Sequence, residues 1–188
     1  MESISLIQAG TAFFKGVSLP VNESTDTSHL RAWAMLGPMT FSISEKIELR
    51  RATPEDFGMA MNLYLVTMKP LTAALMTWDE TKQSTGFAKQ WNVLDAQVIV
   101  FEGRDVGWLQ IAEMPSELFL QQLCISPAYQ RRGIGTKVLQ SLVEHWRKVG
   151  KPVVLTVLKN NPARNLYERL GFNVVGEIGV KFQMRRNF

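Results

Sequence analysis

The chain has 188 residues, of which 46% are hydrophobic and 20% charged, and its formal net charge is +4. These values are typical of one globular domain, and we find neither a run of ~18 apolar residues that would span a membrane nor a secretory signal. The lysines and arginines form no dense stripe with interleaved aromatics, so nucleic acid is not an expected partner. A single cysteine, Cys124, excludes an intrachain disulfide and fits a reducing compartment, so we expect a cytoplasmic protein.

Residues 1–45 contain Ser/Thr/Asn-rich turns and a candidate short helix at 29–36. We interpret them as an N-terminal extension of the domain that follows. Their role stays open among three alternatives, which are an extra capping segment, a partner-binding arm and residues upstream of the true start. The rest of the chain, 46–188, is expected to form a single domain.

The expected domain mixes strands and helices, and it opens with a strand at 47–51. Thr53 as N-cap and Pro54 at the first helical position start a helix, which we expect to run to Thr67 and to be broken by Pro70. The remaining elements follow in chain order: helices at 71–78 and 81–91, strands at 97–102, 106–112 and 118–125 with a tight turn at 103–105, a helix at 136–149, a strand at 153–158, a helix from Asn161 to Gly171, and strands at 172–176 and 180–185. Such a mixture predicts an α+β (mixed α/β) fold, with helices on both faces of a sheet.

A glycine-punctuated loop, Gln130-Arg131-Arg132-Gly133-Ile134-Gly135, lies between the 118–125 strand and the following helix. The N-terminus of that helix leaves backbone N–H groups unpaired and carries the positive end of the helix dipole, which suits a diphosphate. Glycine at 133 and 135 allows close approach of the phosphates, and Arg131, Arg132 and Lys137 add positive charge. The Walker pattern does not fit these residues, nor does the Rossmann pattern, because position 138 is Val.

The loop fits the pattern Q/R-x-x-G-x-G/A and resembles the acetyl-CoA pyrophosphate motif of the GNAT superfamily of N-acetyltransferases. Ahead of it, residues 123–129 resemble the family's lead-in L-x-V-x-P-x-Y, and residues 160–172 resemble its N-x-x-A-x-x-L-Y-x-x-x-G-F element. The two motifs stand in the family's order and spacing, and the resemblance covers about 47–186. It implies a twisted, mostly antiparallel sheet that is splayed between its fourth and fifth strands.

The resemblance also implies that acetyl-CoA binds in the splay, with its pantetheine arm along the 118–125 strand and its diphosphate on the N–H groups of residues 131–136. No metal is expected. The predicted cofactor-binding residues are Leu123, Cys124, Ile125, Gln130, Arg131, Arg132, Gly133, Ile134, Gly135, Thr136 and Asn160. A free backbone N–H near Leu123 or Cys124 would polarise the thioester carbonyl. For Asn160, the alternative is a turn residue ahead of the Asn161 cap.

Tyr167 is the predicted catalytic residue. In the family, the tyrosine at this place protonates the departing thiolate, and a phenol with a pKa of ~10 is suited to that step. The alternative is a packed aromatic on the same helix face as Ala163 and Leu170.

A general base cannot be assigned. Glu113 and Glu117 could act through a water, although both are more often surface charges, and His145 is expected to be solvated. An amine that arrives neutral needs no base. Cys124 is interpreted as a buried thiol rather than a nucleophile, since direct transfer requires no acyl-enzyme.

The acceptor site is the least specified part of the sequence. Trp78-Asp79-Glu80 places an aromatic side chain next to two acids, which could hold a cationic amine. The alternative is a helix-end turn with solvated acids.

These features together predict an acetyl-CoA-dependent N-acetyltransferase that moves an acetyl group to a primary amine of a small molecule, directly and in a ternary complex. The alternatives are a protein acetyltransferase acting on lysine or an N-terminus, and a non-catalytic acyl-CoA-binding sensor module. An enclosed acidic or aromatic pocket would favour the small molecule, and an open groove a protein. The expected partners are the small-molecule amine and a second copy in a homodimer, with no membrane.

Overall fold

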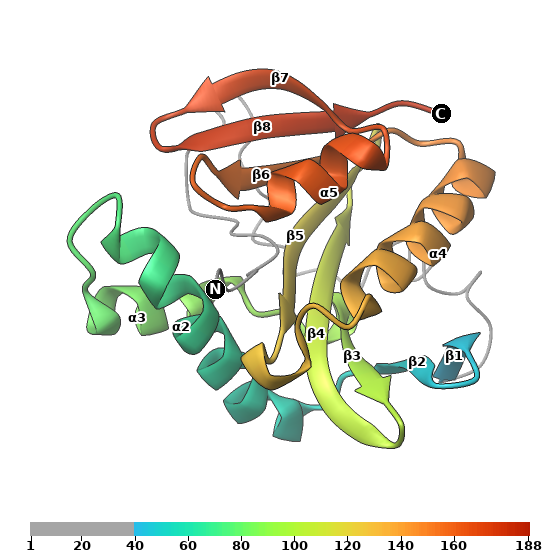
Figure 1. Cartoon of the computed structure of the whole chain (residues 1–188), viewed down its shortest axis with the longest axis horizontal. Coiled ribbons are helices and arrows are strands. Elements are labelled where there is room, and N and C mark those ends of the chain that lie inside the picture. Colours follow the sequence, from blue (N-terminus) through green and yellow to red (C-terminus); the bar gives the residue numbers. More distant parts are fainter. Residues whose placement is uncertain (1–39) are drawn as a thin grey trace.

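The computed structural model describes residues 40–188, so the helix expected at 29–36 lies outside the described part. Its centre is one eight-stranded sheet in the order β1-β2-β3-β4-β5-β6-β8-β7 (Figure 1). The strands are β1 (Thr40–Ser44), β2 (Ile47–Arg51), β3 (Ala96–Phe101), β4 (Arg104–Glu113), β5 (Leu118–Ile125), β6 (Val153–Leu158), β7 (Asn173–Ile178) and β8 (Lys181–Arg186). The helices are α2 (Phe57–Ala73), α3 (Glu80–Gln90), α4 (Ile134–Val149) and α5 (Ala163–Arg169). Neighbouring strands are antiparallel except β5 and β6, which are parallel.

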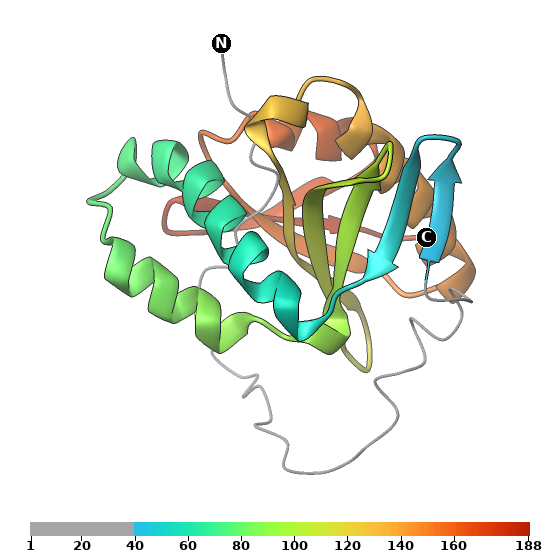
Figure 2. The same ribbon diagram turned by 90° about the horizontal axis from the view of Figure 1, so that it is seen from below.

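Helices cover both faces of the sheet, with α2 and α3 on one face and α4 and α5 on the other (Figure 1, Figure 2). Each face has its own buried core. The larger core lies under α4, whose apolar stripe, including Leu139 and Trp146, is buried as its spacing predicts. The predicted α+β architecture is therefore confirmed. None of the helices within residues 40–188 is long and apolar enough to cross a membrane.

The helix α2 is longer than the sequence predicts. We expected Pro70 to break it and a separate helix over 71–78, whereas α2 continues through Pro70 to Ala73. Proline removes one hydrogen bond and crowds the carbonyl four residues earlier, but Pro70 is exposed and stands in the last turn. Leu71 and Thr72 beyond it are buried, so packing against the sheet keeps that turn helical.

Two further details differ from expectation at the start of the sheet. β1 pairs with β2 and precedes the first strand that the sequence predicts. The β3–β4 turn consists of Glu102 and Gly103, with φ of 50° and 74°, a left-handed pair that suits a two-residue hairpin. Arg104, expected in the turn, already belongs to β4.

The sheet opens between β5 and β6. Parallel pairing joins residues 118–120 to residues 153–155, and the strands then part, although β5 runs on to Ile125 and β6 to Leu158. The predicted splay is therefore confirmed. Because β1 precedes the first expected strand, the splay lies between the fifth and sixth strands of the described sheet.

One extra residue in β5 marks the start of the splay. The pairing of β5 with β4 skips from Leu120 to Gln122, so Gln121 forms a β-bulge. A bulge interrupts the alternation of side chains along a strand, so the residues after it face the side opposite to the one that regular alternation would give them. As a result Gln121 and Gln122 both line a pocket beside α2 and α3, whereas Leu123 returns to the core under α4.

Gly107 of β4 lies so close to the end of β5 that no side chain fits there. A Cβ at this position would lie 2.4 Å from the backbone oxygen of Cys124. We expect Gly107→Ala to displace the end of β5 and to lower the free energy of unfolding by about 1–3 kcal/mol, as measured by urea denaturation.

The matched control is Gly58→Ala in α2, where a Cβ would meet open space among the described residues. Alanine raises helix propensity there and should stabilise the protein by up to about 1 kcal/mol. Equal midpoints and slopes for Gly107→Ala and the wild type would contradict the close approach.

Candidate active site

The N-terminus of α4 can hold an anion. Gly133 is its N-cap, with φ of 78° in the left-handed region that favours glycine, and no side chain in the described part of the chain caps the helix. The first N–H groups of a helix have no intrahelical partner. They face the loop together with the positive end of the helix dipole, so residues 130–136 fit a diphosphate.

Positive charge surrounds this N-terminus. Arg131, Arg132 and Lys137 are exposed, and the first turn of α4, all of it described, has no acidic residue. The guanidinium of Arg132 lies 5.1 Å from the ring centroid of Tyr129, which restrains it beside the loop. An anion at the helix N-terminus therefore meets both the positive end of the helix dipole and these exposed cations.

The end of β5 lies next to the loop. The Nε2 atom of Gln130 donates a hydrogen bond of 2.7 Å to the backbone oxygen of Ile125. Leu123, Cys124 and Ile125 are each at most 2% exposed. The thiol of Cys124 is buried, as predicted, and accepts a hydrogen bond from the Thr67 hydroxyl. Since their side chains are packed in the two cores, these residues can meet a ligand in the splay through their backbone.

Tyr167 lies on α5, fully buried, in the same core as Leu123 and Val157 from the two strands that part. Its ring meets that of Phe172 edge-on, with centroids 5.9 Å apart. Burial raises the pKa of the Tyr167 phenol well above its usual value, and the nearby Cys124 raises it further. Tyr167 therefore keeps its proton across the neutral range, as a proton donor must. Its catalytic role stays a prediction.

Asn160 joins two elements across the splay. Its Nδ2 atom donates a hydrogen bond of 2.9 Å to the backbone oxygen of Leu71 in the last turn of α2. The next residue, Asn161, accepts a hydrogen bond of 2.9 Å from the N–H of Ala163, the first residue of α5, whose N-cap position is held by Pro162 rather than by Asn161. Contact of Asn160 with a cofactor stays a prediction, and the structure shows that its side chain also connects the β6–α5 loop to α2.

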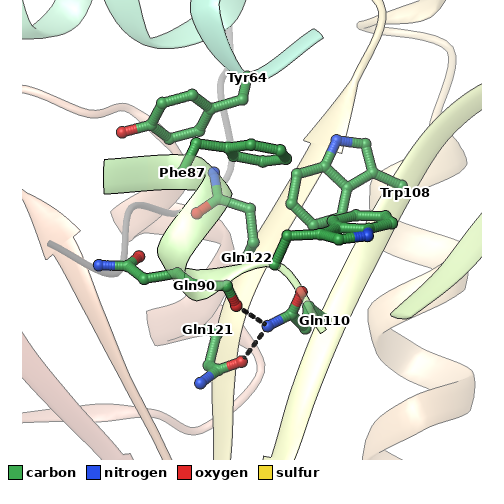
Figure 3. Close-up of a pocket in the computed structure, with 8 residues that line it drawn as sticks. Tyr64, Phe87, Gln90, Trp108, Gln110, Gln121 and Gln122 are labelled. Carbon is green, nitrogen blue, oxygen red and sulfur yellow. Dashed lines mark hydrogen bonds between the residues drawn. The ribbon is translucent and has the colours of Figure 1, made fainter. Parts of the chain in front are cut away.

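An aromatic pocket that the sequence did not predict lies between α2, α3 and the sheet (Figure 3). It is lined by Tyr64, Phe87, Gln90, Trp91, Trp108, Gln110, Gln121 and Gln122. Gln121 and Gln122 directly follow the last residue of β5 that pairs with β6, so the pocket lies at the apex of the splay. The cavity is about 20 Å³, room for one water molecule or one amino group, and about 260 Å³ when its open mouth is included.

Hydrogen bonds between amides shape one side of the pocket (Figure 3). The Nε2 atom of Gln110 donates to the backbone oxygen of Gln90 at 2.8 Å and to Oε1 of Gln121 at 2.5 Å. None of the eight lining residues, all within the described range, carries a formal charge. One signal in the sequence could have revealed this site. The core-facing apolar positions are even-numbered before Gln121 (118 and 120) and odd-numbered after Gln122 (123 and 125), which is the shift in alternation that a bulge produces.

The cluster Trp78-Asp79-Glu80 lies at the other end of α3 from the pocket. Asp79 is the N-cap of α3 and accepts a hydrogen bond of 2.9 Å from the N–H of Lys82. Glu80 pairs with Lys69 at 3.3 Å, and both acids are exposed. Because α3 has 11 residues, its ends lie about 16 Å apart. The structure does not bring this cluster to the pocket, and its substrate role stays a prediction.

The candidate bases have structural partners. Glu113 forms an ion pair with Lys151 at 2.6 Å and Glu117 one with Arg185 at 2.8 Å. Glu113 ends β4 and pairs with Leu118, and Glu117 directly precedes β5, so both carboxylates lie at the opposite end of β5 from the loop. His145, expected to be solvated, is half-buried with its Nε2 atom below the surface. Within residues 40–188 no cluster of His, Cys, Asp and Glu could hold a metal ion.

Comparison with known proteins agrees with this geometry. The family model described as acetyltransferase (GNAT) domain matches residues 94–174. Spermine/spermidine N(1)-acetyltransferase of Bacillus subtilis is 28% identical over 111 residues, which cover 53% of this chain and 73% of that protein.

Solved structures show the same fold. The PaiA N-acetyltransferase of Thermoplasma acidophilum, in complex with coenzyme A, superposes with a TM-score of 0.61 at 18% identity, over 76% of this chain and 99% of that one. The ribosomal L7/L12 alpha-N-protein acetyltransferase RimL superposes with a TM-score of 0.60 at 19% identity, over 79% of this chain and 94% of that one.

The N-cap of α3 provides a test of the Trp78-Asp79-Glu80 cluster. Asp79→Ala is expected to lower the free energy of unfolding by about 1 kcal/mol, whereas Asp79→Asn should keep it, because Asn caps a helix as well as Asp. If the carboxylate acts only as a cap, the Asn variant keeps the wild-type KM for every amine tested in steady-state kinetics. A KM raised for cationic amines in the stable Asn variant would show a substrate contact instead.

Proposed function

Because the chain belongs to the GNAT acetyltransferases, we propose that it transfers an acetyl group from acetyl-CoA to a primary amine of a small molecule, directly and in a ternary complex. The observation that supports this most is a succession of features along β5. The uncapped N-terminus of α4 follows its end, the parted edge runs over 121–125, and the aromatic pocket lies at 121–122. A cytoplasmic location and a homodimer stay predictions.

The chain's own groups fit the cofactor in two places. The N–H groups of residues 131–136 and the cations around them suit the diphosphate. From Leu120 to Ile125 β5 extends about 16 Å without β6 beside it, so its backbone can pair with an amide-bearing arm as with an added strand. When bound, acetyl-CoA supplies the activated acetyl thioester.

The residues near the apex then serve the transfer itself. A backbone N–H near Leu123 or Cys124 would stabilise the negative charge on the carbonyl oxygen. The acceptor nitrogen forms a bond to the acetyl carbon as the carbon–sulfur bond breaks, and Tyr167 donates its proton to the sulfur. The product nitrogen releases a proton to solvent, and the tyrosine recovers one. The buried environment that raises the pKa of Tyr167 would also raise the pKa of a thiol beside it.

The pocket favours a small acceptor over the alternatives. A small cavity with aromatic walls and an open mouth suits a small molecule, whereas a protein acceptor needs a longer open groove. The sensor alternative predicts binding without turnover. Titration of acetyl-CoA by calorimetry, followed by a screen of amines for thiol release, separates these functions: binding with release supports a transferase, and binding without release from any amine supports the sensor.

Tyr167→Phe tests the proton donor. The expected result is a kcat about 10²–10⁴-fold lower with the affinity for acetyl-CoA nearly unchanged, because the phenyl ring fills the same space. Because the pKa of Tyr167 is raised, its protonated form persists as pH rises, so wild-type kcat should not fall through tyrosine ionisation below pH ~10. Wild-type turnover in the Phe variant would remove Tyr167 from the mechanism.

Gly135→Glu tests the diphosphate site. Gly135 lies in the first turn of α4, where a negative side chain interacts favourably with the helix dipole, so the fold should be retained. The new carboxylate should repel the phosphates and block their approach to the loop. We expect no detectable acetyl-CoA binding by calorimetry. Gln140→Glu places the same charge on an exposed position of the same helix and should bind like the wild type. Normal affinity in Gly135→Glu would contradict the assignment of the loop.

A further inference from the structure

We propose that the acceptor is a monoamine carried on an uncharged aromatic group, and that the pocket beside α3 selects it against polyamines. This inference rests on the proposed function and names its substrate class.

The walls are aromatic and mutually supported. Phe87 is central, with ring centroids 5.2 Å from Tyr64, 5.7 Å from Trp91 and 5.6 Å from Trp108. Phe57 packs against Phe87 and Trp91 from the side. Aromatic rings gain most by stacking or edge contact with other rings, so these walls suit a flat ring rather than a flexible chain of methylene groups.

The polar groups of the pocket are amides without charge. Gln90, Gln110, Gln121 and Gln122 line it, and the Tyr64 hydroxyl is occupied by a hydrogen bond of 2.8 Å to Gln83. A polyamine brings at least one ammonium besides the reacting nitrogen. Burial of such a charge without a carboxylate partner costs several kcal/mol, whereas an uncharged ring with a hydrogen-bonding substituent matches amides.

The acids at the start of α3 do not neutralise a cation in the pocket. Asp79 and Glu80 stand at the opposite end of the helix, where one caps α3 and the other pairs with Lys69. Within the described residues, the eight that line the pocket therefore leave a second cation unneutralised. The relative from Bacillus subtilis, whose name specifies spermine and spermidine, is only 28% identical, and its substrate does not carry over to this pocket.

The same composition favours the reactive form of the amine. Attack on the thioester requires a neutral nitrogen, and desolvation lowers the pKa of an amine when no carboxylate stabilises its ammonium. The cavity of about 20 Å³ has room for the amino group, and the side chains of Gln90 and Trp91, where α3 ends, border the pocket and are half-buried. Rotation of the Gln90 side chain would admit the ring, while Trp91 stays stacked on Phe87.

The test compares 2-phenylethylamine and tyramine with spermidine and 1,4-diaminobutane, as kcat/KM from thiol release at saturating acetyl-CoA. The wild type is expected to favour the aromatic amines at least tenfold. Gln121→Glu keeps an acceptor for the Gln110 amide and adds a carboxylate to the pocket. It should shift the ratio at least tenfold toward the polyamines, while the exposed Gln140→Glu leaves the ratio unchanged.

The outcomes separate the two proposals. Acetylation of polyamines in preference to aromatic amines, or an unchanged ratio in a folded Gln121→Glu variant, overturns the substrate class and leaves the acetyltransferase function standing. Binding of acetyl-CoA with no thiol release from any of the four amines overturns the substrate class as well, and amines outside this panel then test the function itself. A shift in Gln140→Glu equal to that in Gln121→Glu would show that overall charge, not the pocket, sets the preference.

Discussion

The β-bulge at Gln121 is the constraint on which the site depends. If β5 alternated regularly through Gln121, Gln122 would face the core under α4, beside Leu118 and Leu120, where its amide would lack partners. With the bulge, Gln121 and Gln122 enter the pocket while Leu123 and Ile125 return to that core. The bulge also stands where β5 leaves β6. One inserted residue thus sets the pocket, the open edge and the core at once.

An open splay in the middle of a sheet needs support from both faces, since parted strands lose their ladder hydrogen bonds. The core under α4 and α5 spans the gap with side chains from both strands. On the other face, Asn160 fastens the loop after β6 to the last turn of α2, and Cys124 packs beneath the same helix. The extension of α2 through Pro70 is part of this arrangement, because the carbonyl that Asn160 contacts belongs to the turn after the proline.

Sequence reasoning predicted those parts of the site that are contiguous in the chain. The loop at 130–136 and the strand at 118–125 each depend on neighbours a few residues away, and both lie as expected. The pocket depends on residues from α2, α3, β4 and β5, whose meeting is set by tertiary packing. The residues around Trp78-Asp79-Glu80 could not be assigned from sequence for the same reason. An acid next to a helix start can serve as an N-cap or as a ligand for a cation, and in the structure Asp79 is the N-cap of α3.

Charge differs between the two ends of β5, and this difference separates the end that suits an anion from the end that suits a neutral group. At the α4 end, exposed arginines and the helix dipole attract an anion from solvent. At the bulge end the lining is neutral, and the low polarity there would raise the free energy of an ammonium more than that of an amine. Tyr167, which packs in the same core as Leu123 of β5, stays protonated at neutral pH because burial raises its pKa. A carboxylate in the pocket would bind amines more tightly but in their unreactive ammonium form. On the proposed function, the neutral lining would favour reaction over ground-state affinity, which is the condition for raising kcat rather than lowering KM.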